Sequence, residues 1–246
     1  MFRLLVLATA AALALAVPAA AGERATVVEL YTSQGCNSCP PADAILGDLA
    51  ARDDVIALSF HIDYWDYLGW KDTFSSAEST SRQKQYARFL GSRGVYTPQM
   101  VIGGVAHAVG SRRERVEELI DAVAARDGQR TEVSLVEGAP GEVLVRIGAA
   151  PPDFTSDRKS AIWLVRFDAS QTVPIERGEN AGRTITYHRV VRAIERIGWW
   201  KGEALELSLQ LADLRDGGRD GCAIIVQQGS HGQIFGAAEM SFAPET

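Results

Sequence analysis

The chain has 246 residues, of which 46% are hydrophobic and 23% are charged, and its formal net charge is −6. This length allows one large or two small domains, and the scattered, mildly acidic charge argues against nucleic acid or an anionic membrane surface as a partner. The sequence contains three cysteines, so at least one of them is left without an intramolecular partner.

The first 21 residues have the features of a cleaved secretory signal. Arg3 supplies a positive charge, residues 4–17 form an apolar stretch, and residues 19–21 are the small residues of a cleavage site. The apolar stretch is shorter than the roughly 20 residues that a membrane span needs. We therefore expect an exported mature chain, periplasmic or secreted from a bacterium, that keeps no membrane anchor.

Cys36 and Cys39 form a C-x-x-C motif at a predicted strand-to-helix junction. The apolar run over residues 26–31 predicts a buried strand, and residues 42–52 predict a helix. A helix N-terminus carries partial positive charge, which stabilises a thiolate and makes it nucleophilic near neutral pH. We expect Cys36 to be the more exposed, attacking sulfur and Cys39, deeper in the first turn, to resolve the mixed disulfide.

Further elements follow the cysteine motif in an alternating order. Residues 55–62 predict a second buried strand, whose carboxyl end lies at the same sheet edge as Cys36. An aromatic-rich loop over residues 63–74 and a helix over residues 75–90 come next. The remaining elements are a strand after Thr97-Pro98, a glycine turn, a returning strand over residues 105–109 and a helix over residues 112–126.

This order, with a C-x-x-C motif after the first strand and a proline opening the third, resembles the thioredoxin fold. The resemblance implies that Pro98 is cis and packs against the disulfide, and that the backbone of Thr97 holds an extended substrate chain beside Cys36. Two features depart from thioredoxins. Asn37-Ser38 replaces Gly-Pro between the cysteines, and a helical insertion covers residues 64–92.

A closer resemblance covers nearly the whole mature chain. The runs over residues 29–43, 61–66, 69–72 and 96–99 resemble the secreted thioredoxin-like family catalogued as domain of unknown function 1223. The resemblance implies a thioredoxin-like domain, but it implies little about activity because the family is named for lacking a known function.

From residue 131 onward the hydrophobic pattern changes to a two-residue period. Clusters of Gly, Pro, Asp and Asn separate the alternating runs, which predicts seven or eight short strands in an antiparallel sandwich. We therefore predict a signal peptide over residues 1–21. An α/β thioredoxin-like domain, a central mixed sheet flanked by helices, follows over residues 22–128. An all-β sandwich-like domain follows over residues 129–246. The third cysteine, Cys222, lies in an apolar run as either a buried inert thiol or a relay partner.

Three polar residues are further candidates at the site. Glu29 stands in the otherwise apolar first strand, where it could shuttle a proton for the cysteines or reach solvent. His61 and Asp63 end the second strand at the predicted active edge, where they could serve as a proton shuttle or hold the reacting residues in position.

The function that these features favour is an exported thiol-disulfide oxidoreductase. Cys36 and Cys39 would be catalytic, Thr97 and Pro98 would bind the substrate, and Glu29, His61 and Asp63 would be possible proton shuttles. Its partners would be protein thiols or disulfides and a redox partner, with no organic cofactor and no metal. Two alternatives remain open: a redox-inactive secreted binding or scaffold protein with a structural disulfide, and a copper-binding chaperone in which His61 adds a ligand.

Overall fold

The computed structural model describes residues 25–126, 128, 130–151, 154 and 159–242. The predicted signal peptide therefore lies outside the described residues. Within the described part of the chain, no helix is long and apolar enough to cross a membrane.

The order of strands and helices predicted for residues 26–126 is confirmed. The elements are β1 (Thr26–Thr32), α1 (Pro40–Leu49), β2 (Val55–His61), α2 (Ala77–Phe89), β3 (Gln99–Ile102), β4 (Ala106–Val109) and α3 (Arg113–Ala124). Strands β1 and β2 are parallel, whereas β3 and β4 are antiparallel to their neighbours. Ser76 caps α2 by accepting a hydrogen bond from the backbone N–H of Ser79.

The second half of the chain is almost entirely strand. Its elements are β5 (Val133–Glu137), β6 (Glu142–Ile147), β7 (Ser160–Pro174), β8 (Thr184–Trp200), β9 (Leu205–Gln210), α4 (Leu211–Leu214), β10 (Gly221–Gln228) and β11 (Ile234–Ser241). The prediction of short strands is wrong for β7 and β8, which have 15 and 17 residues. Their lengths exceed the usual strand because β-bulges let them bend with the sheet.

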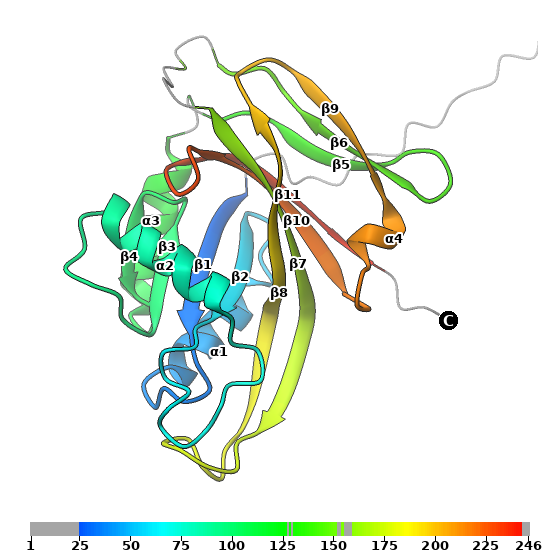
Figure 1. Cartoon of the computed structure of the whole chain (residues 1–246). Helices are drawn as coiled ribbons and strands as arrows, with labels where there is room; N and C mark the ends of the chain where they lie inside the picture. Colours follow the sequence, from blue (N-terminus) through cyan, green and yellow to red (C-terminus); the bar gives the residue numbers. More distant parts are fainter. Residues whose placement is uncertain (1–24, 127, 129, 152–153, 155–158, 243–246) are drawn as a thin grey trace, which may run out of the picture.

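Strands from both halves of the chain join in one sheet. Its eight strands run in the order β11-β10-β7-β8-β2-β1-β3-β4, and the two halves meet where β8 pairs in parallel with β2 at Val190 and Ser59. Figure 1 shows the long pair β7 and β8 crossing the middle of the molecule. A second sheet of three strands, in the order β5-β6-β9, lies beside the β11 end.

Three clusters of buried side chains hold these layers together. Helices α1 and α3 pack on β1, β2 and β3 through residues such as Leu30, Leu46 and Ile120. A second cluster combines β1 and β2 with α2 and with the C-terminal strands, so Phe60 and Ile225 share one core. The third cluster fills the space between the three-stranded sheet and β7, β10 and β11. Burial of apolar surface thus connects both halves of the chain.

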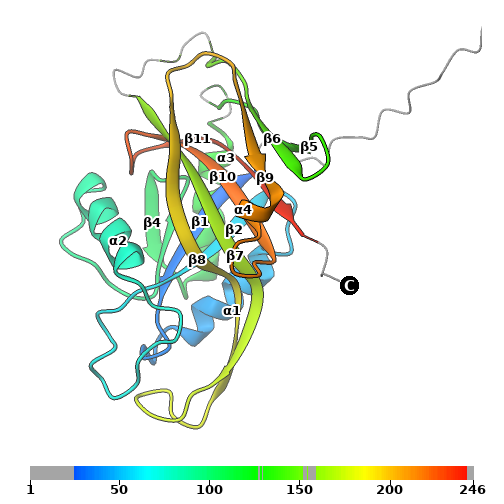
Figure 2. The ribbon, with the colours of Figure 1, turned by 45° about the vertical axis from the view of Figure 1, so that its right-hand side comes forward.

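The hairpin of β7 and β8 extends past the strands that flank it. Strand β10 pairs with β7 only as far as Phe167, whereas β7 and β8 stay paired to Pro174 and Thr184. We call residues 168–189 the β7–β8 arm. At about 3.3 Å per residue its strands reach roughly 20 Å, and both views show its tip near the start of α1 (Figures 1 and 2).

Candidate functional site

The cysteine pair lies in the turn between β1 and α1. Cys36 and Cys39 form a disulfide with a Cα–Cα distance of 5.4 Å. Cys39 is the N-cap of α1, and its carbonyl accepts hydrogen bonds from the backbone N–H groups of Ala42 and Asp43. Cys36 is 5% exposed and Cys39 is fully buried, which confirms the predicted order of accessibility. Cys39 therefore stands at the positive end of α1, and Cys36 is the cysteine nearer to solvent.

Thr97, which precedes Pro98, contacts this turn. The peptide bond between them is cis, which confirms the conformation that the resemblance implied. The hydroxyl of Thr97 donates a hydrogen bond to Cys36 Sγ over 3.3 Å and accepts one from Trp65 Nε1 over 2.7 Å. The resemblance to thioredoxins implies a role for the backbone of Thr97, whereas in the structure its side chain contacts the sulfur directly.

The loop between β2 and α2, residues 62–76, binds Gln34, which lies two positions before Cys36. We call it the aromatic loop. The backbone N–H of Gln34 donates to Asp72 Oδ2 over 2.8 Å, and Gln34 Oε1 accepts from Trp70 Nε1 over 2.8 Å and from the backbone of Thr73. These hydrogen bonds to the backbone and side chain of Gln34 fix the segment that leads into the cysteine turn.

His61 supports the aromatic loop through Asp72. His61 Nδ1 lies 2.7 Å from Asp72 Oδ2, and both side chains are fully buried. Because an ionised carboxylate can only accept, Nδ1 carries the hydrogen. Burial favours a higher pKa for Asp72, but His61 and the backbone N–H groups of Gln34 and Phe74 outweigh burial and lower that pKa. His61 therefore acts on the cysteine turn through Asp72 and Gln34.

Asp63 turns toward α2. Its carboxylate accepts a hydrogen bond from Thr80 Oγ1 over 2.6 Å, and its backbone N–H donates to the same oxygen over 3.1 Å. These bonds fix the start of the aromatic loop against the first turns of α2. The structure thus brings His61 and Asp63 to the predicted edge, where their observed contacts are with Asp72 and Thr80.

Glu29 belongs to a separate buried network. Its carboxylate accepts hydrogen bonds from Arg82 Nε and Nη2, from Tyr31 and from Tyr86, all over 2.8 Å. Burial favours a higher pKa for Glu29, but the charge and hydrogen bonds of Arg82 outweigh it and lower that pKa. All of these partners lie outside the cysteine turn, and the pairing keeps Glu29 ionised, which makes it a poor carrier of protons.

Asp43 is a buried carboxyl near the site that the predicted site residues do not include. It lies one turn into α1, is 2% exposed, and neither carboxyl oxygen has a hydrogen-bond partner among the described residues. Burial raises the pKa of Asp43 to about 7, with nearby His61 and the adjacent Thr32 hydroxyl opposing the rise and Asp72 adding to it. Its position three residues before buried Leu46 is the sequence signal that could have placed it on the covered side of the helix.

The β7–β8 arm forms the remaining wall of the site. The ring of Tyr187 packs edge-on against His61 with centroids 4.9 Å apart. At the tip of the arm, Asn180 Nδ2 donates to the carbonyl oxygens of Gln34 and Cys36, each over 2.9 Å. Residues more than 140 positions away in the sequence therefore contact the cysteine turn.

The other candidate features of the sequence lie elsewhere. In the described part of the chain, no group of three His, Cys, Asp or Glu side chains is placed to hold a metal ion. Cys222 is fully buried in the core under the three-stranded sheet, and burial raises the pKa of its thiol to about 12. This environment is that of an inert core thiol.

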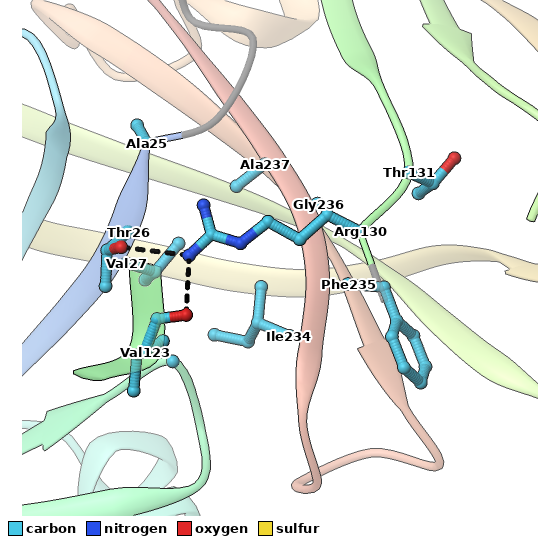
Figure 3. A pocket seen from close by; sticks show the side chains of 11 residues that line it. Ala25, Thr26, Val27, Val123, Arg130, Thr131, Ile234, Phe235, Gly236 and Ala237 are labelled. Atoms are coloured by element: carbon cyan, nitrogen blue, oxygen red, sulfur yellow. Dashed lines mark hydrogen bonds between the residues drawn. The ribbon is translucent and has the colours of Figure 1, made fainter. Parts of the chain in front are cut away.

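A small pocket lies at the opposite end of β1 from the disulfide. Arg130 crosses it and donates to Thr26 Oγ1 over 3.0 Å and to the carbonyl of Val123 over 3.5 Å (Figure 3). Its lining includes Ile234 and Phe235 of the last strand. The pocket contains none of the predicted site residues, and its arginine joins the two halves of the chain.

Comparisons with known proteins identify relatives but no assigned activity. The family model described as "Protein of unknown function (DUF1223)" matches residues 27–227. The crystal structure of protein AGR_C_4864 from Agrobacterium tumefaciens is 34% identical, with a TM-score of 0.78, covering 91% of this chain and 97% of that one. HBP35 of Porphyromonas gingivalis is 15% identical, with a TM-score of 0.58 over 91% of this chain and 77% of that one, which is a likeness of fold alone. No curated protein matches the chain.

Proposed function

The chain belongs to the family described as protein of unknown function (DUF1223), and we propose that it is an exported thiol-disulfide oxidoreductase acting through Cys36 and Cys39. One observation carries the proposal. The Cys36–Cys39 disulfide stands at the N-terminus of α1, and the hydroxyl of Thr97, next to a cis proline, donates to the outer sulfur. Both the helix terminus and this hydroxyl favour a thiolate at Cys36, which exchange chemistry requires.

The fold assignment is part of the proposal. We assign residues 22–128 to a thioredoxin-like domain, supported by the sheet order β2-β1-β3-β4 and by α1 and α3 on one face. We assign residues 129–246 to a sandwich-like domain, supported by the packing of the three-stranded sheet over β7, β10 and β11. Location in the periplasm or outside the cell rests on the predicted signal peptide, and sequencing the N-terminus of protein from the periplasmic fraction tests it.

The exchange takes place in two steps. A substrate thiolate attacks Cys36 Sγ, the Cys36–Cys39 bond breaks, and Cys39 leaves as a thiolate that takes up a proton. A second substrate thiolate then attacks the substrate sulfur of the mixed disulfide, and Cys36 leaves as a thiolate. Two electrons pass from the substrate dithiol to the cysteine pair, and a redox partner with a disulfide removes them. The same steps in reverse reduce a substrate disulfide.

Two groups at the site suit these steps. Thr97 Oγ1 donates to Cys36 Sγ, so it stabilises the thiolate that leaves in the second step. Asp43 follows Cys39 by one helical turn, and burial raises its pKa to about 7, so its carboxyl can exchange a proton near neutral pH. Asp43 therefore replaces Glu29 as the proposed proton carrier for Cys39.

The reduction potential of the cysteine pair tests the proposal. The mature protein is equilibrated with glutathione buffers, and its free thiols are trapped and counted. A potential between about −120 and −270 mV lies in the range of known exchange catalysts. A potential below about −300 mV would mean an inert structural bond and would overturn the enzyme assignment. The matched control is Cys222→Ala, which should leave the potential unchanged because Cys222 lies in a separate core.

A redox-inactive binding or scaffold protein is the second candidate. The low exposure of Cys36, 5%, favours it because a substrate must approach a nearly covered sulfur. Reduction of insulin by the mature protein with dithiothreitol distinguishes the two candidates. A rate above that of dithiothreitol alone, lost in Cys36→Ser, supports exchange, whereas equal rates support the scaffold.

A further inference from the structure

The tip of the β7–β8 arm is built to rest on the cysteine turn. Four backbone hydrogen bonds close the turn between Ile175 and Arg183, including Ile175 N–H to the Arg183 carbonyl over 2.8 Å. Gly178 has a φ of 80°, and a Cβ at this position would lie 3.1 Å from Trp70 Cβ. Glycine suits both the backbone conformation and this close approach to the aromatic loop, and a larger residue would be strained here. The tip therefore has a defined backbone conformation and packs against the aromatic loop.

Asn180 makes the decisive contact of this tip. Its side chain is 1% exposed, and the two hydrogens of its amide point to the carbonyl oxygens of Gln34 and Cys36, each 2.9 Å from Nδ2. The orientation of the amide follows from chemistry, since its oxygen would repel two carbonyl oxygens. One side chain thus satisfies two buried acceptors on either side of Gly35.

Next to Asn180, Glu179 contacts the residue between the cysteines. Glu179 Oε2 accepts a long hydrogen bond, 3.4 Å, from the backbone N–H of Asn37 at an exposed position. The arm therefore contacts the turn at Gln34, Cys36 and Asn37, while the aromatic loop holds Gln34 from the other side. Of these contacts, only that of Asn180 is both buried and donated to a cysteine backbone.

We propose that Asn180 is a positioning residue of the cysteine site, supplied by the C-terminal half of the chain, which holds the Cys36 turn ready for disulfide exchange. The proposal rests on the proposed function and extends it. Carbonyl oxygens carry partial negative charge, and two of them beside Cys36 oppose a thiolate on the same residue. The amide hydrogens of Asn180 offset that charge, so the reduced form of the pair is stabilised.

The test compares three variants of the mature protein. Asn180→Asp keeps the shape but replaces the donor with a negative charge, and Asn180→Ser keeps one donor. Thr172→Val is the matched control, because it removes an exposed hydroxyl contact with Thr186 in the same arm, 2.9 Å long, without touching the turn. The readouts are the equilibrium with glutathione and the pH dependence of Cys36 alkylation.

We expect Asn180→Asp to shift the equilibrium at least about tenfold toward the disulfide, which lowers the potential by about 30 mV. Alkylation of Cys36 should also require a higher pH in this variant. Asn180→Ser should shift both readouts in the same direction by a smaller factor. If Asn180→Asp does not fold, Asn180→Ser is the variant that is compared with the wild type. Thr172→Val should match the wild type.

The proposal is overturned if the folded Asn180 variants keep the wild-type equilibrium and pH profile, or if Thr172→Val shifts them equally. Neither readout needs catalytic turnover, so failure of the positioning role can be distinguished from failure of the proposed oxidoreductase function. A wild-type potential below about −300 mV sinks the enzyme assignment, while a shift in Asn180→Asp would still uphold the positioning role. A wild-type potential in the catalytic range with unchanged Asn180 variants sinks the positioning role alone.

Discussion

Two buried carboxyl groups in this molecule have opposite surroundings. Glu29 accepts two hydrogen bonds from Arg82 and one each from Tyr31 and Tyr86, and its pKa is lowered. Asp43 has no hydrogen-bond partner among the described residues, and its pKa is raised to about 7. Complete pairing keeps a buried charge, whereas burial without pairing removes it near neutral pH.

The difference separates a group that stays charged from a group that can exchange protons near neutral pH. A carboxylate that keeps its charge through the whole physiological range contributes to stability and cannot exchange protons there. A carboxyl that titrates near pH 7 costs stability when it ionises but can exchange a proton near neutral pH. The two groups therefore have opposite effects on the pH dependence of folding.

Breaking the Glu29 network should give the largest effect. Arg82→Met leaves a buried carboxylate without its cation, and such losses cost about 5 kcal/mol of the free energy of unfolding. Urea unfolding at pH 7 measures the cost. The matched control is Glu29→Gln combined with Arg82→Met, in which the amide can still bond Tyr31 and Tyr86. The double variant should recover at least about 2 kcal/mol, and an Arg82→Met protein as stable as the wild type would refute the structural role.

The opposite sign of pH dependence should appear at Asp43. Its folded pKa of about 7 lies above the ordinary value of 3.8, so its stabilising effect is complete below pH 4 and is lost as the pH rises through 7. A shift of this size corresponds to about 4 kcal/mol at pH 8. Asp43→Asn should remove that decline in urea unfolding measured between pH 4 and 8.

An exposed aspartate of the same helix is the control for Asp43. Asp48 lies five residues further along α1, with a side chain that is 65% exposed and paired with exposed Arg113, so Asp48→Asn should retain the decline. Glu29, whose pKa is lowered, contributes stability that is lost as the pH falls, in the direction opposite to Asp43. If Asp43→Asn kept the full decline, Asp43 would not be the group whose ionisation causes it.

Local signals in the sequence predicted the first half of the fold well. The strand before Cys36, the helix after Cys39 and the strand opened by Pro98 each have their own periodicity or backbone constraint, and the structure contains all three. The second half was harder because a two-residue period identifies a strand without naming its neighbour. Nothing in the sequence of β8 indicates that Val190 pairs with Ser59.

The same limit applies to the candidate site. Cys36, Cys39 and Thr97-Pro98 were predicted because their residue types and spacings carry the signal themselves. Asn180 stands in a segment that reads as an ordinary polar turn, and its contact with Cys36 spans 144 positions. Glu29 was proposed as a proton carrier because it stands in an otherwise apolar strand. Its pairing with Arg82 depends on how α2 packs against that strand, which no local pattern in the sequence reveals.

The smallest expected effect is that of replacing Thr97. The substitution tests whether a group that contacts Cys36 Sγ changes the pKa of that thiol rather than the stability of the fold. Thr97→Val keeps the shape but removes the hydroxyl that donates to Cys36 Sγ. We expect the pKa of the Cys36 thiol to rise by about one unit, or about 1.4 kcal/mol, as measured by alkylation rate against pH. The control, Thr80→Val, removes a buried hydroxyl that bonds Asp63 instead, so it should lower stability and leave the alkylation profile unchanged. Equal profiles for the wild type and Thr97→Val would mean that the Thr97 hydroxyl does not stabilise the Cys36 thiolate.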